Sequence, residues 1–477
     1  MINRFSINNA NQKPLLWRIS SAERRGILIL GDLLTTAVAL LVALYFWAQQ
    51  DWLRFSWTFL KERPEKWFYF LPLPWILLII ELYDVRRASR RRDVLQGVGI
   101  AAAISFVLYL GFYFTAQTPL PRRGVLAFII VVSILTILWR LLYIRVFTAP
   151  LFMRRVLIVG AGRAGTALAR VINGIRPGPF HLVGFIDDNL SKINTQIESC
   201  PVLGDSSRLL DIIQRESVSD LIFSISGQMS PGMFQAIQKA AELGVEVTTM
   251  PMVYEDLLGR VPILLLQSDW LIRSFVDQAR TGGSYGAAKR AIDLLGGLVG
   301  SLLCVLVFPI ISLAILLDTG RPIMYSQIRL GKNGRIYKIM KFRTMIQDAE
   351  KDGVARPAIQ NDERVTRVGH YLRKSHLDEL PQFFNVLRGD MSLVGPRAER
   401  TELVEELQNK VPFYRARLLA KPGLTGWAQV NFGYAATVED TTIKLEYDLY
   451  YIKHRNLFLD FLILIRTVGA VVGLRGQ

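Results

Sequence analysis

The chain has 477 residues, of which 51% are hydrophobic, and its formal net charge is +17. At about 150 residues per domain, this length predicts roughly three domains. So much apolar sequence excludes an intrinsically disordered chain, and it argues against a single soluble domain. The two cysteines, Cys200 and Cys304, exclude a disulfide framework, and the four histidines lack the spacing of a zinc site.

The first 150 residues predict a four-helix transmembrane bundle. Asp32, Glu81 and Arg140 lie toward the ends of its apolar segments, where we expect them to reach the membrane interface. The four segments are about long enough to cross a bilayer: Ile27–Trp47, Trp67–Tyr83, Val98–Phe114 and Val125–Phe147.

The basic residues cluster beside these apolar segments. Residues 86–92 contain five arginines, and Arg154-Arg155 follow the last segment, whereas the 49–66 connection carries both signs of charge. The positive-inside rule therefore places both ends of the bundle in the cytoplasm. Basic residues beside apolar helices favour contact with anionic lipids, so we expect membrane lipids and not nucleic acid as the partner of this charge.

Residues 151–282 alternate strands and helices in the pattern of a Rossmann-like, doubly wound α/β domain. Strands are predicted over 156–159, 182–186, 220–226 and 245–250. Gly160, Gly162 and Gly165 form a G-x-G-x-x-G turn between the first strand and a helix, which is weak evidence for a nucleotide site. Asp187-Asp188 lie about 27 residues beyond Gly160, farther than a ribose-binding acid usually does. Nucleotide binding and a structural or assembly role both remain open.

Residues 283–477 begin with a long apolar stretch, 294–317, that contains Pro309. By length it is a fifth membrane crossing. A proline in mid-helix removes a backbone donor and kinks the helix, so the stretch can instead enter the membrane and return to the same face. The chemistry of the sequence that follows favours this re-entrant helix, about residues 290–317. Residues 457–474 are predicted to form an amphipathic helix.

The candidate chemistry centres on Asp378-Glu379, between Ser375 and Pro381. Either Ser375 caps a helix that contains the two acids, or Pro381 occupies the first turn of the next helix. Both alternatives place the acids near a helix N-terminus, where the ionised form is favoured. Adjacent carboxylates repel, so one tends to protonate unless a cation lies between them. An isolated pair of this kind is usually a simple surface capping box.

The surrounding sequence changes that interpretation. Residues 321–345 contain Lys341 and Arg343 with glycine turns at Gly331 and Gly334. Cationic side chains and glycine turns at this density favour the binding of a diphosphate, because arginine makes bidentate contacts with phosphate oxygens.

Six short motifs together carry a family resemblance: KRAID at 289–293, the proline at 309, KFRTM at 341–345, SHLDELPQ at 375–382, GDMSLVGPR at 389–397 and KPGLTGWAQVN at 421–431. Residues 284–477 resemble the bacterial polyprenyl-phosphate sugar-1-phosphate transferases, the monotopic phosphoglycosyl transferases of the undecaprenyl-phosphate hexose phosphotransferase type. The whole layout is similar to the large members that initiate exopolysaccharide or O-antigen synthesis.

The resemblance implies transfer of hexose 1-phosphate from a UDP-hexose to undecaprenyl phosphate, with release of UMP. Asp378 would be the nucleophile that forms a covalent aspartyl-phosphosugar intermediate, and Glu379 would hold Mg²⁺. Lys341, Arg373 and Arg397 would bind phosphate, and we add Arg343 as a further candidate. The transferred hexose and the polysaccharide are not specified by the sequence.

The expected location is the bacterial inner membrane, with several crossings and the active site on the cytoplasmic face. We also expect a homodimer.

Two other functions fit parts of the chain. The glycine turn with Tyr285-x-x-x-Lys289 matches an NAD-dependent nucleotide-sugar dehydratase or epimerase, although Lys289 leads directly into the apolar stretch. A non-enzymatic membrane sensor with a nucleotide-binding domain accounts for residues 1–260 but leaves 320–431 without a role.

Overall fold

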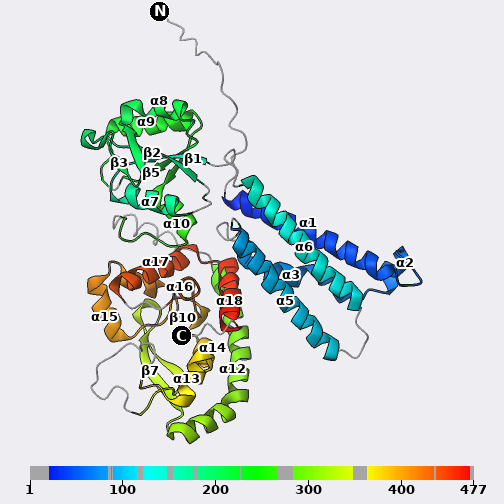
Figure 1. The fold of residues 1–477 in the computed structure, drawn as a ribbon. Helices are drawn as coiled ribbons and strands as arrows, with labels where there is room; N and C mark the ends of the chain where they lie inside the picture. Colours follow the sequence, from blue (N-terminus) through cyan, green and yellow to red (C-terminus); the bar gives the residue numbers. More distant parts are fainter. Residues whose placement is uncertain are drawn as a thin grey trace, which may run out of the picture. The chain divides into compact units, whose positions relative to one another are not determined.

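The computed structural model of the chain divides into two compact units, 1–250 and 251–477 (Figure 1). Of the predicted basic cluster, Arg86 and Arg87 lie outside the described residues. The structure describes residues 21–83, 88, 90–115, 122–147, 154–175, 178, 180–225, 227–266, 283–347, 362–433 and 437–472.

Three of the four predicted apolar segments are long helices: α1 (Ser21–Ala48), α5 (Arg91–Thr115) and α6 (Arg122–Phe147). Each is long and apolar enough to cross a membrane. The fourth described helix with this property belongs to the second unit, where it lies over Gly283–Thr319.

The segment 67–83 is not the single helix that hydropathy predicts. It consists of η1 (Lys66–Phe70), α3 (Pro72–Leu78) and η2 (Ile80–Tyr83), and α2 (Trp57–Glu62) precedes it. Pro72 occupies the first turn of α3, and prolines at 72 and 74 cannot donate the backbone hydrogen bonds of a continuous helix.

These short pieces nevertheless run along the bundle. At one end the ring of Phe68 packs 5.4 Å from Trp47, near the end of α1. At the other end the carbonyl of Leu82 accepts a hydrogen bond from Arg140, which also pairs with Asp32 near the middle of α1. The broken segment therefore packs along the C-terminal half of α1.

Asp32 and Arg140 do not reach the membrane interface, contrary to our expectation. Their side chains are fully buried and form an ion pair with an Nη2–Oδ2 distance of 2.5 Å. Arg140 also donates to the Leu82 carbonyl at 2.7 Å. A charge inside an apolar bundle is tolerated when it is paired in this way.

Residues 154–249 form a six-stranded sheet with the order β3-β4-β2-β1-β5-β6. All neighbouring strands are parallel except β3 and β4. Without the two-residue β3, the order is the 3-2-1-4-5 of a doubly wound sheet. The prediction missed β3 and β4. The strands are β1 (Arg154–Val159), β2 (Phe180–Ile186), β3 (Gln196–Ile197), β4 (Cys200–Gly204), β5 (Asp220–Phe223) and β6 (Glu246–Thr249), and the helices are α7 (Arg163–Gly174), η4 (Leu190–Lys192), η5 (Ser206–Arg208), α8 (Leu209–Arg215) and α9 (Pro231–Glu242).

The second unit combines one long apolar helix with two small sheets, the antiparallel β7–β8 and the parallel β9–β10. Gly331 and Gly334 lie in the β7–β8 connection, as the turns predicted from sequence. The elements are α10 (Met250–Leu258), α12 (Gly283–Thr319), β7 (Met324–Leu330), η7 (Lys332–Gly334), β8 (Ile336–Phe342), α13 (Arg367–Lys374), η8 (Leu377–Glu379), α14 (Gln382–Arg388), β9 (Ser392–Val394), α15 (Thr401–Lys410), η9 (Tyr414–Leu419), β10 (Gly423–Thr425), α16 (Trp427–Asn431), α17 (Val438–His454) and α18 (Leu457–Val472).

Helix α12 continues through Pro309 rather than breaking there, and Figure 1 shows that it bends in its C-terminal part. Near its start, the buried Asp293 accepts hydrogen bonds from the Ser392 hydroxyl and the Leu393 amide, both at 2.9 Å. Near its end, Asp318 accepts from the Val368 amide at 3.1 Å. Both ends of the apolar helix are thus bonded to the same unit.

Strands β9 and β10 approach each other so closely that glycine is required. A Cβ atom on Gly423 would lie 2.1 Å from the Gly395 nitrogen, and one on Gly395 would lie 2.2 Å from the Lys421 oxygen. Both neighbours are backbone atoms, which cannot rotate away. Gly395 and Gly423 therefore serve main-chain packing.

We predict that Gly423→Ala lowers the free energy of unfolding by about 1–3 kcal/mol, because the added methyl group forces the two strands apart. Thermal unfolding of the detergent-solubilised protein measures the change. Gly433→Ala is the control, since a Cβ atom there meets nothing within 4 Å. Equal melting temperatures for the two variants would contradict the packing described here.

Candidate active site

Asp378 and Glu379 lie in a short turn between two helices. Helix α13 ends at Lys374, Ser375 is its C-cap, and His376 adopts a left-handed conformation with φ of 56°. The Ser375 hydroxyl donates back to the Tyr371 carbonyl, so the prediction that Ser375 caps a following helix is wrong. Pro381 directly precedes α14, close to the second alternative. The left-handed residue reverses the chain and brings both acids against β8.

Two cations converge on Glu379. Lys341, on β8, lies with its Nζ 2.6 Å from Oε1, and Arg397, in the loop after β9, lies with its Nη2 2.9 Å from the same oxygen. Burial alone would raise the pKa of Glu379, but the charges of Lys341 and Arg397 outweigh it and hold that pKa well below its usual range. Glu379 is therefore ionised at neutral pH.

Asp378 has a different environment. It is only 7% exposed, and its carboxylate receives no hydrogen bond or ion pair from the residues that the structure describes. Burial raises its pKa; the charge of Lys341 opposes this shift, and the charge of Glu379 adds to it. The structure thus moves the pKa values of two neighbouring carboxyl groups apart, as in acid pairs with separate chemical roles. The raised pKa of Asp378 differs from the stabilised ionised form that we expected at a helix N-terminus.

The two remaining candidate arginines have different positions. Arg373, in the last turn of α13, donates from Nε to the Thr344 hydroxyl at 3.0 Å, and its charge acts on Asp378. Arg343 is buried and donates from Nη2 to the carbonyls of Thr319 and Gly320 at the end of α12. Arg373 thus lies near the acid pair, whereas Arg343 satisfies the last carbonyls of a helix and is not brought to Glu379.

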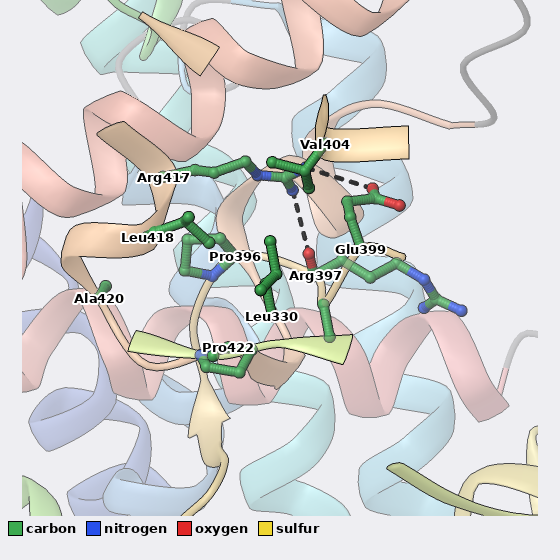
Figure 2. A pocket seen from close by; sticks show the side chains of 11 residues that line it. Leu330, Pro396, Arg397, Glu399, Val404, Arg417, Leu418, Ala420 and Pro422 are labelled. Carbon is green, nitrogen blue, oxygen red and sulfur yellow. Dashed lines mark hydrogen bonds and ion pairs between the residues drawn. The ribbon is translucent and has the colours of Figure 1, made fainter. Parts of the chain in front are cut away.

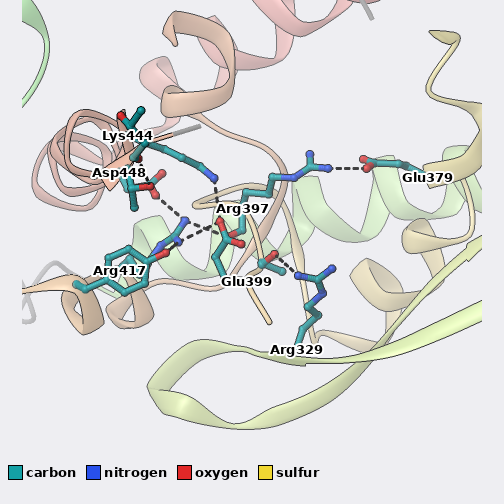
Figure 3. Close-up of polar contacts among 11 residues, drawn as sticks. Arg329, Glu379, Arg397, Glu399, Arg417, Lys444 and Asp448 are labelled. Atoms are coloured by element: carbon teal, nitrogen blue, oxygen red, sulfur yellow. Dashed lines mark hydrogen bonds and ion pairs between the residues drawn. The ribbon is translucent and has the colours of Figure 1, made fainter. Parts of the chain in front are cut away.

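A buried polar cluster supports the loop that carries Arg397. Arg417, on η9, pairs with Asp448 at 2.7 Å and donates to the Arg397 carbonyl at 3.1 Å. Glu399 pairs with Lys444 at 2.8 Å and with Arg417 at 3.3 Å. Figure 3 shows the Arg397 side chain extending from this cluster toward Glu379. This cluster was not found from the sequence, because its bonded pairs lie 18 to 45 residues apart, outside any recognisable spacing.

The charged residues of the KRAID motif have contacts within the unit. Lys289 and Tyr285 both bond to Asp460 on α18 at 3.0 Å, and Arg290 donates to the Val386 and Leu387 carbonyls at the end of α14. The Tyr-x-x-x-Lys spacing that suggested a dehydrogenase pair is thus explained by a structural contact with Asp460.

In the α/β part, the turn at Gly160–Gly165 is hydrogen-bonded to the carboxylate of Asp187. The Asp187 carboxylate accepts from the Ala161 amide at 2.8 Å and from Lys192 at 2.9 Å. Gly160 has a φ of +106°, and a Cβ atom on Gly165 would lie 2.0 Å from the Gly160 oxygen, whereas Gly162 faces open space. Gly160 and Gly165 therefore have structural reasons to be glycine, and Gly162 remains a candidate for contact with a nucleotide.

The donor set fits the expected Mg²⁺. This ion is usually held by one or two carboxylates together with substrate phosphates. Asp378 has no partner among the described residues, and both cations on Glu379 contact the same oxygen, Oε1. Within the described ranges, no group of three or more His, Cys, Asp or Glu side chains gathers as a ready-made metal site. A metal here would thus depend on oxygens supplied by the substrate.

Two known families match parts of this chain. The bacterial sugar transferase family matches residues 284–473, which include the acid pair and the loop of Arg397. A CoA-binding domain family matches residues 79–251.

Three relatives illustrate the similarity. The UDP-N-acetylgalactosamine-undecaprenyl-phosphate N-acetylgalactosaminephosphotransferase of Aeromonas hydrophila is 40% identical over 50% of this chain and 54% of its own. The UDP-glucose:undecaprenyl-phosphate glucose-1-phosphate transferase of Escherichia coli K12 is 41% identical over 38% of this chain and 39% of its own. The putative undecaprenyl-phosphate N-acetylgalactosaminyl 1-phosphate transferase of Bacillus subtilis 168 is 43% identical over 31% of this chain and 81% of its own.

The match thus covers only about half or less of the first two relatives, but most of the third. The family match over residues 284–473 includes the segment in which Lys341 and Arg397 contact Glu379. The chain belongs to the bacterial sugar transferase family.

Proposed function

We propose that this chain transfers a hexose 1-phosphate from a UDP-hexose to undecaprenyl phosphate and releases UMP. The observation that carries the proposal is the unequal acid pair: Glu379 is neutralised by Lys341 and Arg397, while the buried Asp378 carboxylate has no partner among the described residues. The names of the relatives support the same donor and acceptor classes.

In the first step, a carboxylate oxygen of Asp378 attacks the β-phosphorus of the UDP-hexose. The bond from that phosphorus to the bridging oxygen breaks, and UMP leaves with its electron pair. The product is an aspartyl-phosphosugar. In the second step, a phosphate oxygen of undecaprenyl phosphate attacks the same phosphorus, which releases the Asp378 carboxylate and forms undecaprenyl diphosphate hexose. The two steps balance without an oxidant or a further reactant.

The other residues position and neutralise phosphate, which is most of what phosphoryl transfer asks of a protein. Arg397 is 44% exposed and carries a guanidinium that can reach substrate oxygens while it contacts Glu379. Lys341 and Arg373 place two further positive charges near Asp378. Glu379 would hold Mg²⁺ together with substrate phosphate oxygens, and the ion would supply charge neutralisation at the phosphates.

The position of α12 supports a membrane-bound enzyme with its active site on one face. Asp293 and Asp318, near opposite ends of this helix, bond to β9 and α13 of the same unit. A helix that crossed the bilayer would carry its two ends to opposite sides. We therefore propose that α12 enters the inner membrane and returns, with the acid pair at the cytoplasmic surface.

The product class suggests a place at the start of polysaccharide assembly, as in exopolysaccharide or O-antigen synthesis. The relatives include transferases named for UDP-glucose and for UDP-N-acetylgalactosamine, so the transferred sugar is best found with a panel of UDP-sugars.

We predict that Asp378→Asn lowers the rate of UMP release from the best UDP-sugar by at least about a thousand-fold, because an amide cannot form the covalent intermediate. The measurement is a coupled UMP assay on membranes or detergent-solubilised protein. Glu405→Gln, an exposed acid on α15, is the control and retains full activity. Undiminished turnover of Asp378→Asn would show that the nucleophile is another group.

We predict that the β7–β8 turn faces the cytoplasm. A membrane-impermeant maleimide should label Lys332→Cys only after cell lysis, in a background without Cys200 and Cys304. Lys61→Cys, in the connection after α1, is the control and should react in intact cells. Labelling of Lys332→Cys in intact cells would mean that α12 crosses the membrane.

A further inference from the structure

We propose that Arg417 is a positioning residue for the reaction: it fixes the main chain at Arg397 so that the Arg397 guanidinium meets Glu379 and the donor phosphates. This role rests on the proposed transferase function. Arg417 lies outside the acid pair, and its guanidinium contacts the Arg397 carbonyl at 3.1 Å rather than Glu379.

The loop 396–399 is held through its carbonyl groups. The Pro396 carbonyl accepts from the Gly423 amide, and the Glu399 carbonyl accepts from the Leu330 amide. Between them, the Arg397 carbonyl accepts from Arg417, and Ala398 accepts from Arg329 at 3.4 Å. All four consecutive carbonyls are therefore bonded, and Arg417 makes the contact at Arg397 itself.

The residues on either side of Arg397 are packed, and a pocket borders the loop. A small pocket lies against the loop, with Pro396, Ala398, Leu330 and Pro422 among the residues that line it, and both Arg397 and Arg417 border it (Figure 2). Pro396 and Ala398 are buried, and Ala398 belongs to the hydrophobic core of the unit, whereas Arg397 between them is exposed. Packing therefore holds the two neighbours of Arg397, and the hydrogen bond from Arg417 acts at Arg397 itself.

Arg417 is itself rigidly held. Its side chain is 3% exposed, and one nitrogen donates to the Tyr414 hydroxyl at 2.7 Å while the other pairs with Asp448 at 2.7 Å. Glu399 lies 3.3 Å away, and its own pKa is lowered to about 2: burial would raise it, but Lys444 and Arg417 outweigh that effect. A planar guanidinium with donors on several sides can join η9, α17 and the loop at once, which a lysine ammonium cannot do in the same geometry.

The position of the Arg397 main chain matters because its side chain is long and 44% exposed. Its guanidinium is paired with Glu379, so the position of the Arg397 main chain decides whether the side chain reaches that carboxylate. A misplacement of about 1 Å in a substrate-positioning group can cost about a hundred-fold in rate. Arg417 should therefore affect catalysis only through Arg397.

A double-mutant cycle tests this dependence. Arg417→Lys retains the charge opposite Asp448 but loses the planar set of donors, and Arg397→Ala removes the group that Arg417 is inferred to position. The reaction is UMP release from the best UDP-sugar, and each rate is divided by the amplitude of the initial UMP burst in the absence of lipid acceptor. This division removes differences in the fraction of folded enzyme. Arg415→Lys, an exposed residue on the same turn, is the control.

We predict that Arg417→Lys lowers kcat/KM about 30-fold in the wild-type background and less than about 2-fold in the Arg397→Ala background, since coupled residues are not additive. Arg415→Lys should leave both values unchanged. Equal losses from Arg417→Lys in the two backgrounds would overturn the positioning role and show an independent structural effect. A wild-type protein that released no UMP from any UDP-sugar would instead contradict the proposed function itself.

The Arg417→Lys substitution can itself prevent folding, because the buried Asp448 loses part of its pairing with Arg417. Tyr414→Phe then serves in the same cycle, since it removes one hydrogen bond to Arg417 without a change of charge. We expect a loss of about 3-fold that again disappears in the Arg397→Ala background. A loss of the same size in both backgrounds would overturn the role.

Discussion

Two adjacent carboxyl groups cannot both be buried and ionised without nearby positive charge, and this constraint organises the second unit. The structure resolves it unequally, since both cations pair with Glu379 and none pairs with Asp378 among the described residues. One acid is thereby held ionised, and the other stays available to a substrate. The separation of the two pKa values depends on the positions of Lys341, on β8, and of Arg397, in the loop after β9.

The surrounding fold sets the positions of these two cations. The left-handed His376 turns the chain between α13 and α14, and the glycines of β9 and β10 let two main chains meet. Asp293 ties the apolar helix α12 to β9, close in sequence to Arg397. The apolar helix and the loop of Arg397 are thus anchored to the same short strand, which suits the proposed transfer from a water-soluble donor to a lipid acceptor.

The sequence was most informative where chemistry is local. Lys341, which the motifs assign to the site, lies against Glu379, and the Gly160 turn lies between a strand and a helix as its spacing requires. The sequence was least informative where tertiary contacts determine the position of a side chain. Arg343 looks like a phosphate ligand in sequence but bonds to the end of α12, and Arg417 acquires its partners only after distant segments fold together. Asp32 and Arg140 show the same limit, because hydropathy alone does not reveal that two charges 108 residues apart are paired.

The most direct test of the unequal acid pair is mass spectrometry of the protein after incubation with a UDP-hexose and no lipid acceptor. Rapid acid quenching and proteolysis should yield one peptide, containing Asp378, that is heavier by the mass of a hexose phosphate, and later addition of undecaprenyl phosphate should remove the added mass. An unmodified Asp378 peptide in protein that has released a full equivalent of UMP would contradict the account.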